Sequence, residues 1–184
     1  DGAEPYEFDG NIECWVRPRN EQFNRFLAGP SHCDFWRASP PGRFLLLRGY
    51  DEDGGEQFES GKIFDTTLPI WRLGECLLHA ANMANLLNDG DGDVIVKFRA
   101  QYTGLSGRSL TSWANPINRL GIEGGVAKSD EALIEIETTA SQINENLTDQ
   151  LLPLVNSLYD RFGVSGVSRD FVEGEVSRLI KSKV

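Results

Sequence analysis

The sequence predicts one α+β domain, with a four- or five-stranded mixed or mostly antiparallel sheet and helices packed on it. Alternating apolar residues, which are typical of strands, recur between stretches whose apolar residues keep helical spacing. The 184 residues are enough for one domain with a sizeable core. Hydrophobic and charged fractions of 40% and 25% are ordinary for a globular protein.

The first part of the chain predicts a linker, two strands and a helix. Residues 1–10, DGAEPYEFDG, are polar and acidic, so we expect a linker that precedes a domain over 11–184. The alternation in NIECWVRP (11–18) predicts a short strand. NEQFNRFLAGP (20–30) begins with a good N-cap and ends with Gly-Pro, which favours a helix. The unbroken apolar run in RFLLLRGY (43–50) predicts a central strand that is buried on both faces.

The middle of the chain predicts a loop, a long helix and a strand. DEDGGEQFESGK (51–62) is acidic and rich in glycine, so it predicts a loop. IWRLGECLLHAANMANLL (70–87) belongs to a helix with Thr67 as its N-cap and Pro69 in its first turn. DVIVKFRAQYTG (93–104) alternates for most of its length and predicts a strand.

The last third of the chain predicts a loop, a strand and two helical segments. Residues 104–125 are expected to form mostly loop. EALIEIETTASQI (131–143) predicts a strand that passes into a helix. That helix should kink or break at Pro153 and end at a glycine cap, Gly163. A final helix is predicted to start at the N-cap Ser168.

Charge and cysteine content limit the function of the chain. A net charge of −10 repels phosphate backbones, so direct nucleic-acid binding through this segment is not expected. No apolar run approaches the roughly 20 residues that span a bilayer, so we expect no membrane contact. Three cysteines without CxxC spacing favour reduced thiols in a cytoplasmic protein. Neither a metal nor a cofactor is expected.

Three glycine-rich motifs resemble known sites but fail in detail. In GGEQFESGKI (54–63), five residues rather than four separate Gly55 from Gly61, and Ile63 stands where a P-loop needs Ser or Thr. DEDGG (51–55) and DGDGD (89–93) both lack the glutamate that ends a calcium loop. We therefore predict turns and solvated loops at these positions.

The strongest candidate site is a polar stripe on the long apolar helix. Arg72, Glu75 and His79 share one face at spacings of three and four residues. Such a stripe can be a satisfied polar seam under a loop, or a surface that a neighbouring domain or subunit covers. It can also line a small-molecule pocket in which His79 titrates.

Two strand ends form a second candidate site. The turn after residue 103 carries Gly104, Gly107 and Arg108, and glycine N–H groups with one guanidinium can hold an anion. The alternative is that the glycines only turn the chain while Arg108 pairs with an acidic neighbour. The segment from Arg48 to Asp51 lies at another predicted strand end. We therefore hypothesise that Arg48 and Arg108, at neighbouring strand ends, bind an anionic small ligand or an acidic partner segment.

Four phrases of the sequence are similar to one family. FWRASPPGRFLLLRGYDED (35–53), FDTTLPIWRLGECLLHAANMA (64–84), YTGLSGRSL (102–110) and LLPLVNSLYDRFGV (151–164) resemble the carboxy-terminal region of bacterial Schlafen/AlbA-type proteins. The resemblance implies a multidomain transcriptional regulator or ATP-binding protein whose amino-terminal domain carries the nucleic-acid or nucleotide function. None of that domain's catalytic residues has a counterpart in this chain.

Together these observations predict a non-catalytic regulatory, sensing or interaction domain that binds a ligand or a protein. Its expected partner is a neighbouring effector domain or protein. One alternative is a small hydrolase that uses His79, oriented by Glu75, with Cys76, Ser106 or Ser109 as nucleophile. Another is a homodimerisation domain in which the helices after residue 139 form the contact.

Overall fold

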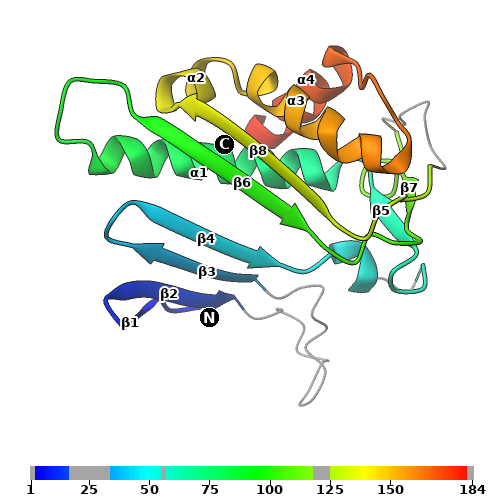
Figure 1. The fold of residues 1–184 in the computed structure, drawn as a ribbon, viewed down its shortest axis with the longest axis horizontal. Coiled ribbons are helices and arrows are strands. Elements are labelled where there is room, and N and C mark those ends of the chain that lie inside the picture. The colour runs from blue at the N-terminus through cyan, green and yellow to red at the C-terminus, as the bar shows by residue number, and fades with distance from the viewer. Residues whose placement is uncertain (1–2, 17–33, 55–56, 118–124, 182–184) are drawn as a thin grey trace. The chain divides into compact units, whose positions relative to one another are not determined.

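The computed structural model describes residues 3–16, 34–54, 57–117 and 125–181 (Figure 1). It confirms the α+β class, with a four-stranded antiparallel sheet, two two-stranded sheets and four α-helices among the described residues. The chain divides into two compact units, 1–60 and 61–184, where the sequence predicted a single domain. The predicted helix over 20–30 lies outside the described residues.

The first unit contains the four-stranded sheet. Its strands lie in chain order and are antiparallel: β1 (Tyr6–Phe8), β2 (Asn11–Val16), β3 (Asp34–Ser39) and β4 (Arg43–Arg48). The predicted strand over 11–18 is therefore confirmed as β2. The prediction of a linker over 1–10 is wrong, because β1 lies within it and pairs with β2.

A two-residue turn makes this pairing feasible. Asp9 and Gly10 connect β1 to β2 with φ angles of 49° and 70°, both in the left-handed region. Two such residues form a type I′ turn, whose twist matches that of a β-hairpin. The Asn11 side-chain amide also donates a hydrogen bond to the Asp9 carbonyl oxygen at 2.9 Å.

The apolar run of β4 does not form a central strand. β4 lies at an edge of the sheet, and Phe44, Leu45 and Leu47 are exposed. A continuous apolar run supplies both faces of a strand, but it does not determine how many neighbours the strand has. The predicted loop after β4 also contains a 3₁₀ turn, η2 (Asp51–Gly54).

The second unit combines two small sheets with all four α-helices. Its elements are β5 (Ile63–Asp65), α1 (Leu68–Leu87), β6 (Ile95–Tyr102), β7 (Ser109–Thr111), β8 (Ala132–Thr139), α2 (Ala140–Glu145), α3 (Leu147–Tyr159), η3 (Asp160–Phe162) and α4 (Arg169–Lys181). β6 and β8 pair antiparallel, while β5 and β7 pair parallel. Figure 1 shows α1 running along the β6–β8 pair, and α1 also contacts α2, α3 and α4.

One apolar face of α1 is buried in the core. Ile70, Leu73 and Leu77 are buried as their helical spacing predicts. Gly74 lies on the same side, and a Cβ atom there would approach Leu179 Cδ2 of α4 to 2.8 Å. The glycine therefore allows a close packing of α1 against α4. Among the described residues, no helix has the length and apolarity needed to span a membrane.

The helix that follows β8 breaks earlier than predicted. α3 continues through Pro153, whereas the chain interrupts its helical course at Asn146, between α2 and α3. The predicted glycine cap is confirmed, since Gly163 has a φ of +75° directly after η3. The predicted N-cap of α4 is also confirmed, because Ser168 Oγ accepts from the Phe171 N–H at 3.3 Å.

Candidate functional site

The polar stripe on α1 is only partly covered. Arg72 and Glu75 are half-buried, and His79 is exposed to solvent. A satisfied seam under a loop would bury all three side chains. The exposed imidazole fits a solvent-facing or partner-facing helix surface better.

The hydrolase alternative receives no support from the geometry. Ser109 of β7 pairs with Ile63 of β5, which directly precedes α1. At the rise expected for an α-helix, His79 lies about 16 Å along the helix axis from Leu68, the first residue of α1. Ser109 is therefore near the start of the helix, and His79 is not. Cys76, a half-buried free thiol, is three residues from His79 on the same helix. In the described part of the chain, no three His, Cys, Asp or Glu side chains form a group that could hold a metal ion.

Arg108 has a structural role at the predicted anion turn. Its side chain is 4% exposed, and its guanidinium donates to main-chain oxygens of Gly104 (2.8 Å) and Ile63 (2.9 Å). Gly104 and Gly107 have φ angles of +69° and +79°, so the turn needs both glycines. The guanidinium links the turn to β5 by hydrogen bonds. Because it donates to carbonyl oxygens of the protein itself, the structure does not support the anion-binding hypothesis.

Arg48 is held by a partner on the neighbouring strand. It lies opposite Asp34 in the β3–β4 register, and Nε and Nη2 donate to the two carboxylate oxygens at 2.8 and 2.7 Å. β4 and β7 belong to different sheets, so Arg48 and Arg108 do not lie at neighbouring strand ends of one sheet. The sheet topology therefore does not support the two-arginine hypothesis, which stays a prediction. Asp51 begins η2 and is half-buried.

A buried carboxylate that the sequence did not single out organises the start of α1. Asp65 is 0% exposed and accepts four main-chain N–H groups. Oδ1 accepts from Thr67 and Leu68 at 2.7 Å each, and Oδ2 accepts from Trp113 and Ala114 at 2.8 Å each. The carboxylate therefore caps the helix and fixes the segment after β7.

Glu175 of α4 is a second buried carboxylate in this unit. It is 0% exposed and accepts from Trp71 Nε1 at 3.0 Å and from Asn115 Nδ2 at 2.9 Å. Both carboxylates are engaged by the protein's own donors, as buried charges must be. Neither is available for chemistry on a substrate.

The helices after residue 139 offer little apolar surface for a dimer contact. The apolar residues that give α3 and α4 their helical pattern are buried, including Leu151, Leu154, Leu158, Val172 and Val176. Ile180 is the large apolar side chain of α4 that remains exposed. A dimer through these helices is therefore not favoured.

The largest group of exposed aromatic and aliphatic side chains lies on one side of the four-stranded sheet. Residues that pair directly in an antiparallel sheet share a face, and the register places Trp15, Phe35 and Leu47 in one row and Glu13, Arg37 and Leu45 in the next. In β1, Tyr6 lies opposite Glu13. Phe8 lies two residues further along the same strand and therefore on the same face as Tyr6. We call this side the aromatic face; it consists of Tyr6, Phe8, Asn11, Glu13, Trp15, Phe35, Arg37, Ser39, Arg43, Leu45 and Leu47.

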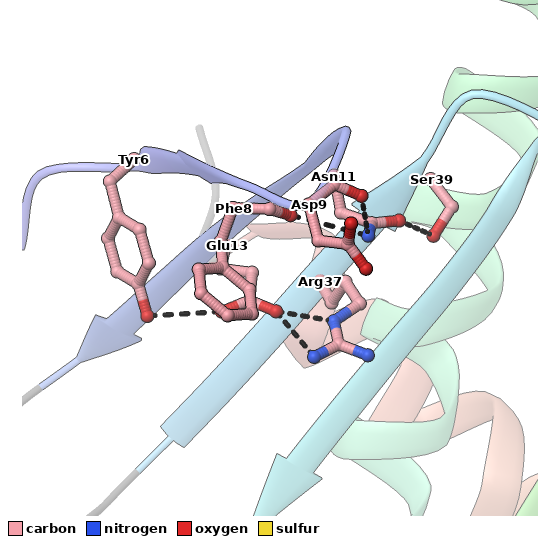
Figure 2. Close-up of polar contacts among 7 residues, drawn as sticks. All are labelled: Tyr6, Phe8, Asp9, Asn11, Glu13, Arg37 and Ser39. Carbon is pink, nitrogen blue, oxygen red and sulfur yellow. Dashed lines mark hydrogen bonds and ion pairs between the residues drawn. The ribbon is translucent and has the colours of Figure 1, made fainter.

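A charged pair lies in the middle of the aromatic face. Figure 2 shows Tyr6, Glu13 and Arg37 in line across β1, β2 and β3. Arg37 Nε donates to Glu13 Oε1 at 2.6 Å, and the Tyr6 hydroxyl donates to Glu13 Oε2 at 3.1 Å. Partial burial raises the pKa of Tyr6, and the hydrogen bond to the Glu13 carboxylate and its charge raise it further. These three side chains thus link β1, β2 and β3.

The rings around this pair remain open to solvent. Tyr6, Phe8 and Trp15 are 43%, 60% and 53% exposed. Trp15 packs on Phe35 with 4.7 Å between ring centroids. Contiguous exposed apolar surface is uncommon on monomeric proteins and marks interaction sites. The aromatic face is therefore the candidate functional site.

Sequence reasoning missed this face because it placed residues 1–10 in a linker. The signal was present, since Asp-Gly between two stretches of strand-forming residues is a strong hairpin pattern. β3 was also missed, because DFWRAS lacks a clean apolar alternation.

Comparisons with known proteins add no identification: no model of a protein family, no curated protein and no solved structure matches the chain.

Proposed function

We propose that the chain is a non-catalytic interaction domain in a multidomain bacterial transcriptional regulator of the Schlafen/AlbA type. It would regulate a neighbouring effector domain of the same protein, or sense a signal on behalf of that domain. The observation that carries this proposal is the aromatic face, where Phe8 and Trp15 project exposed rings from a four-stranded antiparallel sheet. Rigid aromatic side chains are preferred anchors of protein interfaces because they bury a large area at a small entropy cost.

The polar groups of the second unit support a structural rather than a catalytic role. Asp65, Arg108 and Glu175 are buried and bonded to donors or acceptors of the protein itself. We also infer a cytoplasmic location, which the free thiols of Cys14 and Cys76 support because oxidising compartments favour disulfides.

Hydrogen–deuterium exchange tests the proposal. Amide exchange of residues 6–16 is measured in the isolated chain and in the protein of the full reading frame. Docking of the effector domain on the aromatic face should slow exchange of these amides in the longer protein. Equal exchange rates in the two proteins would contradict the proposal.

A pair of variants makes the test specific to this face. Phe8→Ser with Leu47→Ser removes two exposed side chains of the aromatic face and should abolish the protection. Leu86→Ser with Ile117→Ser removes exposed apolar side chains of the second unit and should leave the protection intact.

A further inference from the structure

β4 is an edge strand without the usual protection against further pairing. In the sheet that the described residues form, β4 pairs with β3 on one side and with no strand on its outer side. Phe44, Leu45 and Leu47 are exposed on it, and between its terminal arginines the strand contains neither a charge nor a proline. Edge strands usually carry such residues because they prevent pairing with another strand. The outer side of β4 is therefore suited to pair with a further strand.

The side chains of β4 define the kind of strand that fits beside it. Leu45 and Leu47 belong to the aromatic face, whereas Phe44 and Leu46 belong to the opposite face. An added strand would contact apolar side chains on both faces of the sheet, so it should itself be apolar on both faces. β4 of a second copy of the chain has this pattern and the same length of six residues.

Two copies of β4 can pair antiparallel about a two-fold axis perpendicular to the sheet. Such an axis keeps both aromatic faces on one side, so opposite residues must both be odd-numbered or both be even-numbered. A pairing centred on Leu45 places Phe44 opposite Leu46 of the other copy. A pairing centred on Leu46 places Leu45 opposite Leu47 of the other copy. Neither register places an arginine opposite an arginine.

We propose that the chain forms a two-fold symmetric dimer in which the β4 strands of two copies pair antiparallel. The pairing joins two four-stranded sheets into one continuous sheet and covers both β4 edges. The other edge of each sheet is β1, which has only three residues and follows Pro5, so assembly stops at two copies. Such closed two-fold contacts are the commonest kind between identical chains.

The dimer adds a partner to the proposed function, and the two proposals fail separately. The two aromatic faces would lie on the same side of the continuous sheet, each available to its own effector domain. A monomeric chain would refute the dimer without affecting the expected exchange protection of residues 6–16. Loss of that protection would refute effector docking without affecting the dimer.

The net charge of −10 opposes the dimer but does not exclude it. Two chains of this charge repel each other at low salt. Residues 43–48 contain no acid, and at physiological salt, exposed charges more than about 8 Å apart are largely screened. The apolar contact should therefore dominate, and association should become stronger as salt is raised.

Sedimentation velocity of the whole 184-residue chain tests the inference. Because a six-residue edge is a small interface, the sedimentation coefficient should rise from the monomer value toward the dimer value over about 5 to 200 µM. Raising the salt concentration from about 50 to 300 mM should move this rise to lower protein concentration. A monomer at every concentration and salt would overturn the inference.

Matched variants distinguish pairing through the β4 edge from contact through a face of the sheet. Phe44→Lys places a charge on the edge strand and should weaken dimerisation about tenfold. Its control is Ile12→Lys, because Ile12 lies in the same cross-strand row at similar exposure (52% against 44%) but on the inner strand β2. Equal weakening by both variants would overturn the inference. Thermal unfolding checks that each variant is folded.

Disulfide cross-linking on the two-fold axis tests the pairing itself. Opposite residues of antiparallel strands have Cα atoms about 4.5–5.5 Å apart, which a disulfide can bridge. One of the variants Leu45→Cys and Leu46→Cys, the one at the centre, should therefore give a linked dimer on a non-reducing gel after oxidation with copper–phenanthroline.

The control for cross-linking lies at the end of the same strand. At about 3.3 Å per residue, Arg43 lies at least about 13 Å from its own copy in either register, so Arg43→Cys should not cross-link. The unsubstituted chain gives the background from its own three cysteines. Equal cross-linking at all three positions, or none above background at Leu45 and Leu46, would overturn the inference.

Discussion

Asp65 and Thr67 lie two residues apart at the start of α1, and the structure assigns the capping role to Asp65. Thr67, the N-cap predicted from the sequence, makes no side-chain capping bond, and its buried hydroxyl has no hydrogen-bond partner. Asp65 instead accepts from the N–H groups of Thr67, the N-cap residue, and Leu68, the first residue of the helix. A Thr before Leu-Pro is a good N-cap by statistics, but the carboxylate two residues before it satisfies the first N–H groups here.

Substitutions at these two positions should have very different effects on stability. Asp65→Ala removes the acceptor of four main-chain N–H groups, one of them buried and three part-buried, and should lower the free energy of unfolding by roughly 3–5 kcal/mol. Thr67→Val keeps the shape and removes only an unpartnered hydroxyl, so its effect should stay below about 1 kcal/mol. Urea denaturation measures both, and equal losses would show that Thr67 caps the helix after all.

Asp93 should make the stability of the protein depend on pH in the acid range. Hydrogen bonds from the side chains of Ser141 and Thr139 lower its pKa from 3.8 to about 2. A carboxyl whose pKa is lower in the folded state stabilises that state above pH 3.8, and the contribution is lost as the pH falls toward 2. Asp93→Asn should therefore unfold with a flatter dependence on pH between about 4 and 2.

The partner of Asp93 provides the control for this prediction. Ser141 donates to Asp93 through both its N–H and its hydroxyl, and Ser141→Ala removes only the hydroxyl bond. Urea midpoints measured across the acid range should flatten in Ser141→Ala as well, and less than in Asp93→Asn. Curves parallel to that of the wild type would refute the assignment.

At the scale of elements, the β1–β2 hairpin depends on its turn. Gly10 has a φ of +70°, and a Cβ atom there would meet no other atom within 4 Å. Gly10→Ala should thus cost only the backbone penalty of a left-handed residue, about 1 kcal/mol. Gly92→Ala is the control, because that residue also has open space but no such φ. Urea unfolding and amide exchange of Tyr6–Phe8 measure the effect, and identical losses in both variants would contradict it.

Elements whose apolar residues recur at a clear period could be predicted from the sequence. Short strands and strands without apolar alternation could not. β6 and β8 alternate over eight residues each, and α1 buries the residues that its helical spacing predicted. β5 has only three residues, too few for a period to emerge. Pro153 is accommodated inside α3, since tertiary packing overrides the local preference that placed a break there.

At the scale of the whole molecule, the division at residue 60 predicts that the second unit folds by itself. Residues 61–184 contain their own core, built around Ile70, Leu77, Leu158 and Phe162. A fragment over 61–184 should unfold cooperatively, with an enthalpy of about 85 kcal/mol near 60 °C for its length. Scanning calorimetry measures this, and a broad transition without a heat-absorption peak would show that it needs the first unit.

The candidate site illustrates why function was harder to predict than fold. Arg48, Arg108 and Asp51 were singled out because their residue types suit ligand binding, yet Arg48 and Arg108 serve the fold through Asp34 and main-chain oxygens. The aromatic face depends on cross-strand register between β1, β2 and β3, which brings Tyr6, Glu13 and Arg37 together. Register is a tertiary property that no local window of sequence contains.

Asp65 also has a consequence for the order of folding events. Its two oxygens serve amides two or three residues away and others 48 or 49 residues away. Closing a chain segment of that length costs about 3 kcal/mol of entropy before the distant amides arrive. The capped start of α1 should therefore consolidate after the rate-limiting barrier, so that stopped-flow kinetics of Asp65→Ala show faster unfolding with nearly unchanged refolding.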